Sequence, residues 1–162
     1  MVTNVYFIRH AQSDYTIKED NIRPLTTKGL EDTEKITETL KDKKITKIYS
    51  SPYLRTIDTV KDLTEKLKLD ILVIEDFYER RVGEWVENFY EYARRQWEDF
   101  NYKLENGESL REVQERNISA LHSVLKESNG MNIVIRTHGT ALSTIINYYD
   151  TDFQFDSFCN HR

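Results

Sequence analysis

The chain has 162 residues, a formal net charge of −5 and a single cysteine, Cys159. Its length fits one domain spanning residues 1–162, and 31% charged with 38% hydrophobic residues is typical of a soluble globular protein. One cysteine excludes an internal disulfide framework, and the negative charge argues against general nucleic-acid binding. The apolar run at residues 5–8 is too short for a signal peptide or a membrane span. We therefore expect a cytoplasmic protein that binds neither nucleic acid nor membrane.

Short apolar runs alternate along the chain with longer amphipathic stretches. The apolar runs predict strands at 2–8, 45–49, 71–74 and 132–135, and a last strand at 153–158. The amphipathic stretches predict helices at 27–41, 54–67, 90–104, 109–126 and 140–148. Ser109 and Glu112 have the spacing of a capping box at the start of the fourth helix. This alternation predicts an α/β fold, a three-layer α/β/α sandwich with a mostly parallel central sheet.

Polar residues follow each of the first four predicted strands. In open α/β sheets the functional site lies beyond the carboxyl ends of the strands, so these residues are expected to converge at one edge. Two of the four histidines in the chain are among them, each next to a loop that also carries an arginine. In chain order the groups are Arg9, His10, Gln12 and Ser13; Ser50, Ser51 and Arg55; Glu75, Asp76 and Glu79; and Arg136, Thr137, His138 and Gly139.

Such a cluster could bind a metal ion or an anion. Two histidines with nearby carboxylates suit zinc, but Arg9 and Arg55 are permanently charged and would repel a dication. Guanidinium groups match the oxygens of phosphate, and helices that begin near Ser51 and Thr140 offer free N–H groups to an anion. The residues therefore favour a phosphate pocket that uses no metal and no other cofactor.

Several segments of the chain resemble the histidine phosphatase (phosphoglycerate mutase-like) superfamily. They run in order from about residue 6 to about residue 142 and read FIRHAQS, RPLTTKGLEDTEKI, IYSSPYLRTIDTV, ERRVGEW, NGESLREVQER and VIRTHGTAL. The chain departs from the family pattern at Ala11, where the family has Gly, at Thr16 and at Thr56. The segment WVE replaces the usual Trp-Glu-Gly after Gly83.

The resemblance implies a catalytic role for each residue that matches a family motif. His10 would attack phosphorus and become a phosphohistidine, while Arg9, Arg55 and a protonated His138 neutralise the phosphate oxygens. Glu79 would protonate the leaving group and then activate water, with Asp76 and Glu84 as rivals for this role. Ser13 and Gly139 complete the residues expected to contact phosphate or substrate.

The function that fits these residues is hydrolysis of a small phosphorylated metabolite by a monomer or homodimer. A phosphoglycerate mutase-type transfer and a protein phosphohistidine phosphatase are the enzymatic alternatives. A binding module that has lost activity is a third alternative, against which the intact Arg9, His10, Arg55 and His138 argue. Residues 86–108, rich in aromatic residues and arginine, are interpreted either as a lid insertion over the substrate or as a half-buried helix.

Overall fold

Four parallel strands form the centre of the computed structural model, which describes residues 1–9 and 11–160. The strands are β1 (Asn4–Arg9), β2 (Lys47–Ser50), β3 (Ile71–Val73) and β4 (Asn132–Thr137). Their order in the sheet is β1-β4-β2-β3, and every pairing is parallel. Strand β4 has neighbours on both sides, which explains its nearly continuous burial.

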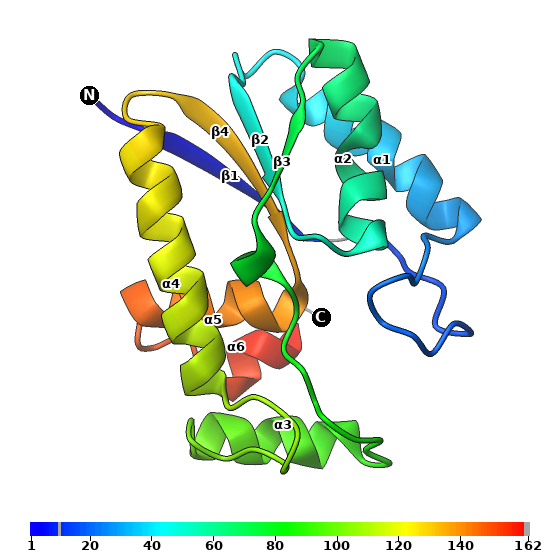
Figure 1. Ribbon diagram of the computed structural model, residues 1–162, viewed down its shortest axis with the longest axis vertical. Helices are drawn as coiled ribbons and strands as arrows, with labels where there is room; N and C mark the ends of the chain where they lie inside the picture. Colours follow the sequence, from blue (N-terminus) through cyan, green and yellow to red (C-terminus); the bar gives the residue numbers. More distant parts are fainter. Residues whose placement is uncertain (10, 161–162) are drawn as a thin grey trace.

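Helices cover both faces of the sheet (Figure 1). On one face, α1 (Thr27–Leu40) and α2 (Leu54–Leu67) pack on the strands, and the core includes Ile8, Ile48 and Val134. On the other face lie α4 (Leu110–Glu127) and α5 (Gly139–Tyr149), whose core includes Ile133 and Ile135 of β4. Because neighbouring residues of a strand point to opposite faces, β4 contributes alternately to the two cores. The predicted three-layer α/β/α sandwich with a parallel sheet is confirmed.

A third apolar cluster lies away from the sheet, where α3 (Phe89–Glu98) packs against α6 (Phe155–Asn160). Trp97 of α3 contacts the rings of Phe153 and Phe158 at centroid distances of 6.1 and 5.6 Å. The strand predicted at 153–158 is therefore wrong. The alternating phenylalanines suggested a period of two, but Phe155 and Phe158 lie three residues apart on one helical face toward α3.

Several element boundaries also differ from the sequence prediction. Helix α3 ends at Glu98, six residues before the predicted end, because Asp99 adopts an extended backbone and its side chain accepts a hydrogen bond from Asn101 N at 2.9 Å. Strand β4 continues two residues past the predicted end and includes Arg136. A 3₁₀ turn, η1 (Glu75–Phe77), follows β3. In the described part of the chain, no helix combines the length and apolarity that crossing a bilayer would need.

The capping box predicted at the start of α4 is present. Ser109 Oγ accepts a hydrogen bond from Glu112 N at 3.2 Å, and Glu112 Oε2 accepts one from Ser109 N at 2.8 Å. We predict that Ser109→Ala lowers the free energy of unfolding by about 1 kcal/mol, because an N–H at the helix start loses its acceptor. Urea unfolding followed by circular dichroism measures this. Ser123→Ala, on an exposed position of the same helix, is the control, and an equal loss there would contradict the capping role.

Candidate active site

A cavity of about 820 Å³ opens at the carboxyl ends of the strands. Its inner part is lined by Arg9 at the end of β1, Arg55 in the first turn of α2, Glu79, and Gly139 at the start of α5. Its rim comes from residues 15–23 on one side and from residues 80–89 on the other. Four residues predicted for the site therefore line one cavity, as expected from their positions after the strands.

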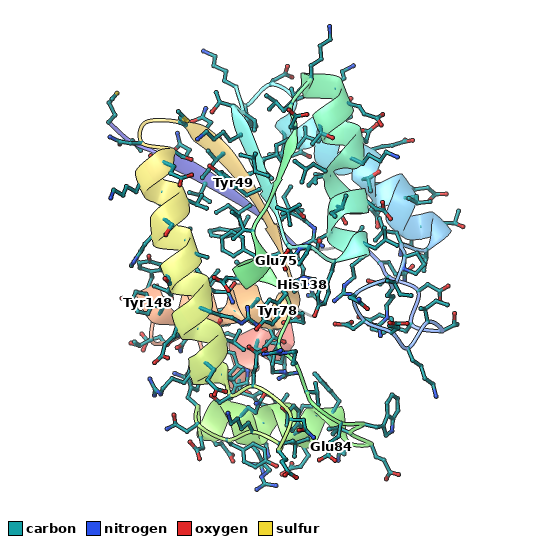
Figure 2. All side chains as sticks on the ribbon, in the orientation of Figure 1. Tyr49, Glu75, Tyr78, Glu84, His138 and Tyr148 are labelled. Carbon is teal, nitrogen blue, oxygen red and sulfur yellow. The ribbon has the colours of Figure 1, made fainter. Side chains whose placement is uncertain are left out.

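Of the other predicted site residues, His138 and Ser13 do not line the cavity. His138 is fully buried near the centre of the molecule (Figure 2) and is not among the residues that line the cavity. Ser13 is buried, pairs with Leu25 through a β-bridge, and is not among the lining residues. His10 lies outside the described residues, directly after Arg9 in the chain. Its role remains a prediction.

Arg55 is 3% exposed and is held by Asp20. Its Nη1 donates to the Asp20 carbonyl oxygen and lies 3.1 Å from Asp20 Oδ1, while its Nη2 lies 3.4 Å from Asp20 Oδ2. Asp20 also pairs with Arg23 at 2.7 Å. A carboxylate from the rim therefore contacts both terminal nitrogens of Arg55.

His138 is the N-cap residue of α5 and contacts both Ser51 and Arg55. Its Nε2 is 2.7 Å from Ser51 Oγ, and its Nδ1 is 3.1 Å from Arg55 Nη2. A guanidinium can only donate, so in this contact Nδ1 stands as the acceptor. The protonated state that the sequence predicts for His138 remains a prediction.

The Glu79 carboxylate sits at the amino end of α5. Its Oε2 accepts from Thr140 N and its Oε1 from Ala141 N, both at 3.1 Å, and Oε1 also accepts from Arg80 N at 2.8 Å. The start of a helix attracts negative charge, so α5 fixes this carboxylate at the cavity wall. Of its two rivals from the sequence, Glu84 also lines the cavity, whereas Asp76 lies in η1 and does not.

Close packing at Gly139 brings Arg9 against the same helix start. A Cβ on Gly139 would lie 3.3 Å from Arg9 Nε, which is tighter than ordinary contact. Gly139 therefore leaves room for the Arg9 guanidinium beside the first turn of α5. The two strand-end segments that carry Arg9 and His138 are adjacent because β1 pairs with β4, with Arg9 opposite Thr137.

Three of the four departures from the family pattern lie beside the cavity, whereas Trp85 and Val86 of the WVE segment line it. Ala11 is buried, and its N–H lies 3.4 Å from Thr59 Oγ1. Thr56 donates its hydroxyl to Ser51 O at 2.9 Å, and Thr16 bonds to Asp14 on the exposed rim. None of the three is a lining residue.

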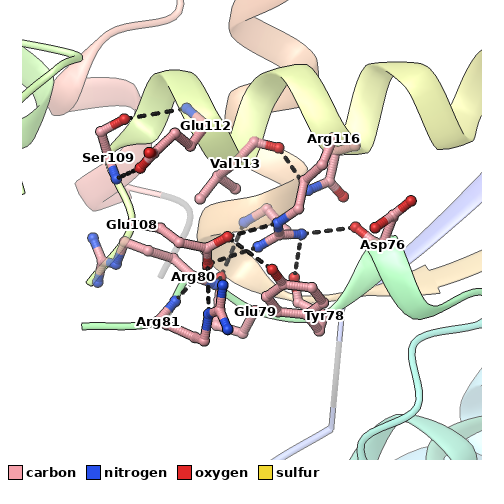
Figure 3. Close-up of polar contacts among 12 residues, drawn as sticks. Asp76, Tyr78, Glu79, Arg80, Arg81, Glu108, Ser109, Glu112, Val113 and Arg116 are labelled. Atoms are coloured by element: carbon pink, nitrogen blue, oxygen red, sulfur yellow. Dashed lines mark hydrogen bonds and ion pairs between the residues drawn. The ribbon is translucent and has the colours of Figure 1, made fainter. Parts of the chain in front are cut away.

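A buried carboxylate, Glu108, holds the segment that carries Glu79 (Figure 3). Glu108 Oε1 accepts from Tyr78 Oη and Arg116 Nε, both at 2.9 Å, and Oε2 accepts from Arg81 N at 2.9 Å. Arg116 Nη1 in turn donates to the carbonyl oxygens of Tyr78 and Asp76. Residues on both sides of Glu79 are thereby tied to α4.

Two glycines allow this segment to approach Glu108. Gly83 has a φ of +91°, and a Cβ on Gly107 would lie 2.4 Å from Val82 O. We assigned no role to Glu108 or Arg116 from the sequence, although both lie in the segment NGESLREVQER. One feature of the sequence could have indicated their role. Glu108 and Arg116 lie eight residues apart in NGESLREVQER, a segment of the family pattern to which no catalytic group is assigned.

Residues 86–108 form a half-buried helix and a returning loop. Tyr92 and Trp97 of α3 are buried, and Arg94 pairs with Glu91 on the exposed side. From this segment, the residues that line the cavity are Val86, Phe89 and Asn106. The arginines and tyrosines of residues 86–108 do not line the cavity, so a role of this segment as a lid remains a prediction.

The comparison with family models decides which family the chain represents. The model of the histidine phosphatase superfamily (branch 1) matches residues 5–158. The chain belongs to the histidine phosphatase superfamily. Among the residues described, no group of three or more His, Cys, Asp or Glu side chains is arranged to hold a metal ion.

Named relatives of this superfamily member differ in the activity that their names give. A "Probable phosphoglycerate mutase GpmB" of Escherichia fergusonii is 28% identical over 155 residues, which cover 88% of this chain and 72% of the relative. An "Uncharacterized phosphatase PhoE" of Bacillus subtilis (strain 168) is 26% identical over 149 residues, covering 90% and 76%. The solved structure of Bacillus stearothermophilus YhfR superposes with a TM-score of 0.80 at 24% identity, covering 97% of this chain and 84% of that one. The last similarity supports the fold alone.

The Glu108 interactions predict a pH-dependent stability. Burial on its own raises the pKa of Glu108, but the hydrogen bonds from Arg116 and Arg81 N outweigh it and lower the pKa below the ordinary value of 4.5. Ionised Glu108 therefore stabilises the fold above its unfolded pKa, and this contribution is lost as the pH falls through the lower, folded pKa. We expect Glu108→Gln to lower the free energy of unfolding by about 2 kcal/mol at pH 7 and by much less near pH 3.

Urea unfolding of both proteins from pH 7 to pH 3 measures this difference. The exposed neighbour Glu105 offers a matched control, and Glu105→Gln should leave stability unchanged at both pH values. A loss in Glu108→Gln that is constant across this range would show that the charge of Glu108 contributes nothing.

Proposed function

We propose that this superfamily member hydrolyses a small-molecule phosphate monoester through a phosphohistidine on His10, without a metal ion. The observation that carries the proposal is the convergence of Arg9, Arg55 and Glu79 on one cavity, with the buried His138 in contact with Arg55. His10 follows Arg9 directly, and two arginines with a carboxylic acid supply the charges and the proton that phosphoryl transfer needs.

The chemistry proceeds in two balanced steps. In the first, a ring nitrogen of His10 forms a bond to phosphorus, the bond from phosphorus to the ester oxygen breaks, and Glu79 gives its proton to the departing alkoxide. In the second, Glu79 takes a proton from water as the water oxygen attacks the phosphohistidine, which releases inorganic phosphate and free His10. Arg9 and Arg55 stabilise the charge on the phosphoryl oxygens in both steps.

The cavity supports a small phosphorylated metabolite as the substrate. Its volume of about 820 Å³ falls in the range of small-molecule sites and leaves room beyond a phosphate group. The rim carries two exposed aromatic side chains, Tyr15 and Trp85, and the cations Lys18 and Arg81. These groups suit an organic portion that is partly apolar and carries negative charge.

A mutase is the second candidate, because a relative at 28% identity is named a phosphoglycerate mutase. The same His10 would then return the phosphoryl group to another hydroxyl of the substrate instead of to water. The two reactions differ in whether inorganic phosphate is released, which one assay decides.

We expect His10→Ala to lower hydrolysis of p-nitrophenyl phosphate by at least about 1,000-fold, because the nucleophile is lost. His122→Ala is the matched control, since His122 is an exposed histidine of α4 that bonds to Tyr149, and it should retain full activity. Release of phosphate is followed with and without a chelator. Unchanged activity in His10→Ala would rule out the phosphohistidine, and loss of wild-type activity with chelator would rule out a metal-free reaction. Conversion of a phosphoglycerate without phosphate release would favour the mutase.

A leaving-group comparison tests Glu79 as the proton donor. An alkyl phosphate needs protonation of its leaving oxygen far more than p-nitrophenyl phosphate does. We expect Glu79→Gln to lower kcat by about 100-fold or more for the alkyl ester and by clearly less for the aryl ester. Equal losses on both esters would indicate that Glu79 acts only through its bonds to the start of α5.

Asp20 should compete with phosphate for Arg55. Phosphate can use both terminal nitrogens of Arg55 only if the Asp20 carboxylate moves away, and that carboxylate also repels the incoming anion. We predict that Asp20→Asn tightens binding of inorganic phosphate by about threefold, measured by isothermal titration calorimetry. Asp14 is half-buried just before the rim segment, bonds to Thr16 and does not line the cavity, so Asp14→Asn serves as the comparison. Weaker binding in Asp20→Asn would show that Asp20 orients Arg55 and does not compete.

A further inference from the structure

Arg136 is an arginine that the mechanism above does not use. It is fully buried in β4, next to Ile8 of β1 and Ser50 of β2 in the register of the sheet. Since Ile133 and Ile135 point to the α4–α5 face, Arg136 lies with Val134 on the α1–α2 face, whose core is apolar. A charged side chain therefore lies at the end of a hydrophobic layer.

The guanidinium of Arg136 is poorly satisfied where it lies. Its Nη1 donates to Ile8 O at 3.1 Å. Its Nε and Nη2 are buried and have no hydrogen-bond partner among the described residues. Buried polar groups are nearly always paired, and an unpaired one is costly to the fold. An arginine with a purely structural role would be expected to meet a carboxylate or several carbonyl oxygens.

The surroundings of Arg136 connect it to the cavity. Burial, followed by the neighbouring Arg55 and Arg9, lowers the pKa of Arg136 well below its usual range, whereas Glu79 raises it. A guanidinium stays protonated even in such surroundings, so it keeps its charge. Three positive side chains thus repel one another near the carboxyl ends of β1 and β4. Two of them, Arg9 and Arg55, line the cavity directly.

We propose that Arg136 is a positioning residue that strengthens binding of the phosphoryl group from beneath the cavity, through its charge and without touching the ligand. A phosphate dianion between Arg9 and Arg55 supplies the negative charge that the buried guanidinium lacks. Arg136 then lowers the free energy of unfolding of the protein without phosphate. Binding of phosphate restores this free energy, because the dianion attracts the buried guanidinium. This inference rests on the proposed phosphate site, but it does not require that the bound ester be hydrolysed.

The test compares Arg136→Met with Arg136→Lys. Methionine has similar length, removes the charge and can pack with Ile8, Ile48 and Val134. We expect Arg136→Met to raise the thermal midpoint of the phosphate-free protein and to weaken binding of inorganic phosphate by about tenfold. Arg136→Lys at pH 6 keeps a positive charge and should bind phosphate within about threefold of the wild type. Arg94→Met removes an exposed arginine of α3 that is not a lining residue, and it should change neither quantity.

Thermal unfolding without phosphate and calorimetric titration with inorganic phosphate give both readouts. A lower midpoint in Arg136→Met, or its failure to fold, would overturn the inference, because Arg136 would then stabilise the empty protein. Equal weakening in the Met and Lys variants would also overturn it, since shape and not charge would be responsible. Phosphate binding with this pattern in a wild type that hydrolyses no ester would leave the inference intact and remove the proposed function. If the wild type hydrolyses an ester and Arg136→Met binds phosphate as tightly as the wild type, the proposed function stands and the inference about Arg136 fails.

Discussion

Parallel pairing between β1 and β4 is the constraint on which the site depends. Along the chain, 122 residues separate the end of β1 from the start of β4, yet Arg9 lies opposite Thr137 in the sheet. The ends of the two strands are therefore carried to the same edge, where α5 begins with Gly139 against Arg9. Strand β2, on the other side of β4, adds Ser51, whose hydroxyl contacts His138. A slip of one residue in this register would point each strand-end side chain to the opposite face.

Glu79 depends on a second constraint, because it is not on a strand or a helix. Two sets of contacts hold it from opposite directions. The start of α5 binds its carboxylate, and Glu108 with Arg116 holds the backbone of the segment around it. Loops are the most mobile parts of most folds, so a catalytic acid on a loop needs such contacts to stay in place. This explains why a buried acid and an arginine lie in a segment of which only Asn106, among the described residues, lines the cavity.

Much of the fold follows from local sequence patterns. The bounds of α2 agree with the 3.6-residue spacing of its apolar side chains, and the capping box of α4 follows from Ser109 and Glu112. The prediction of a strand at 153–158 is wrong because the phenylalanines there pack on Trp97 of α3. No local spacing of residues reveals such a tertiary contact. The cavity-lining positions of Arg9, Arg55 and Glu79 were predictable from their places after strands. Asp20 was not, since its role depends on a rim loop folding back onto Arg55.

Charge balance links these observations. The chain carries a net charge of −5, yet its candidate active site gathers Arg9, Arg55 and Arg136. Acidic residues partly neutralise this positive charge. Asp20 pairs with Arg55, and the Glu79 carboxylate accepts a hydrogen bond from Thr140 N at the start of α5. The proposed binding of phosphate would then be an exchange, in which a dianion replaces the Asp20 carboxylate beside the arginines.

The same exchange explains how one site can be both stable and reactive. Carboxylates of the chain limit the repulsion among the arginines at the cavity, but within the described residues none pairs with Arg136, whose Nε and Nη2 have no hydrogen-bond partner. In the proposed role of Arg136, its unneutralised positive charge attracts the phosphoryl group. Arg136 itself is fully buried and shielded from water. Electrostatic interactions are stronger there than at the surface, so an arginine that is unfavourable to the empty fold favours the state with phosphate bound.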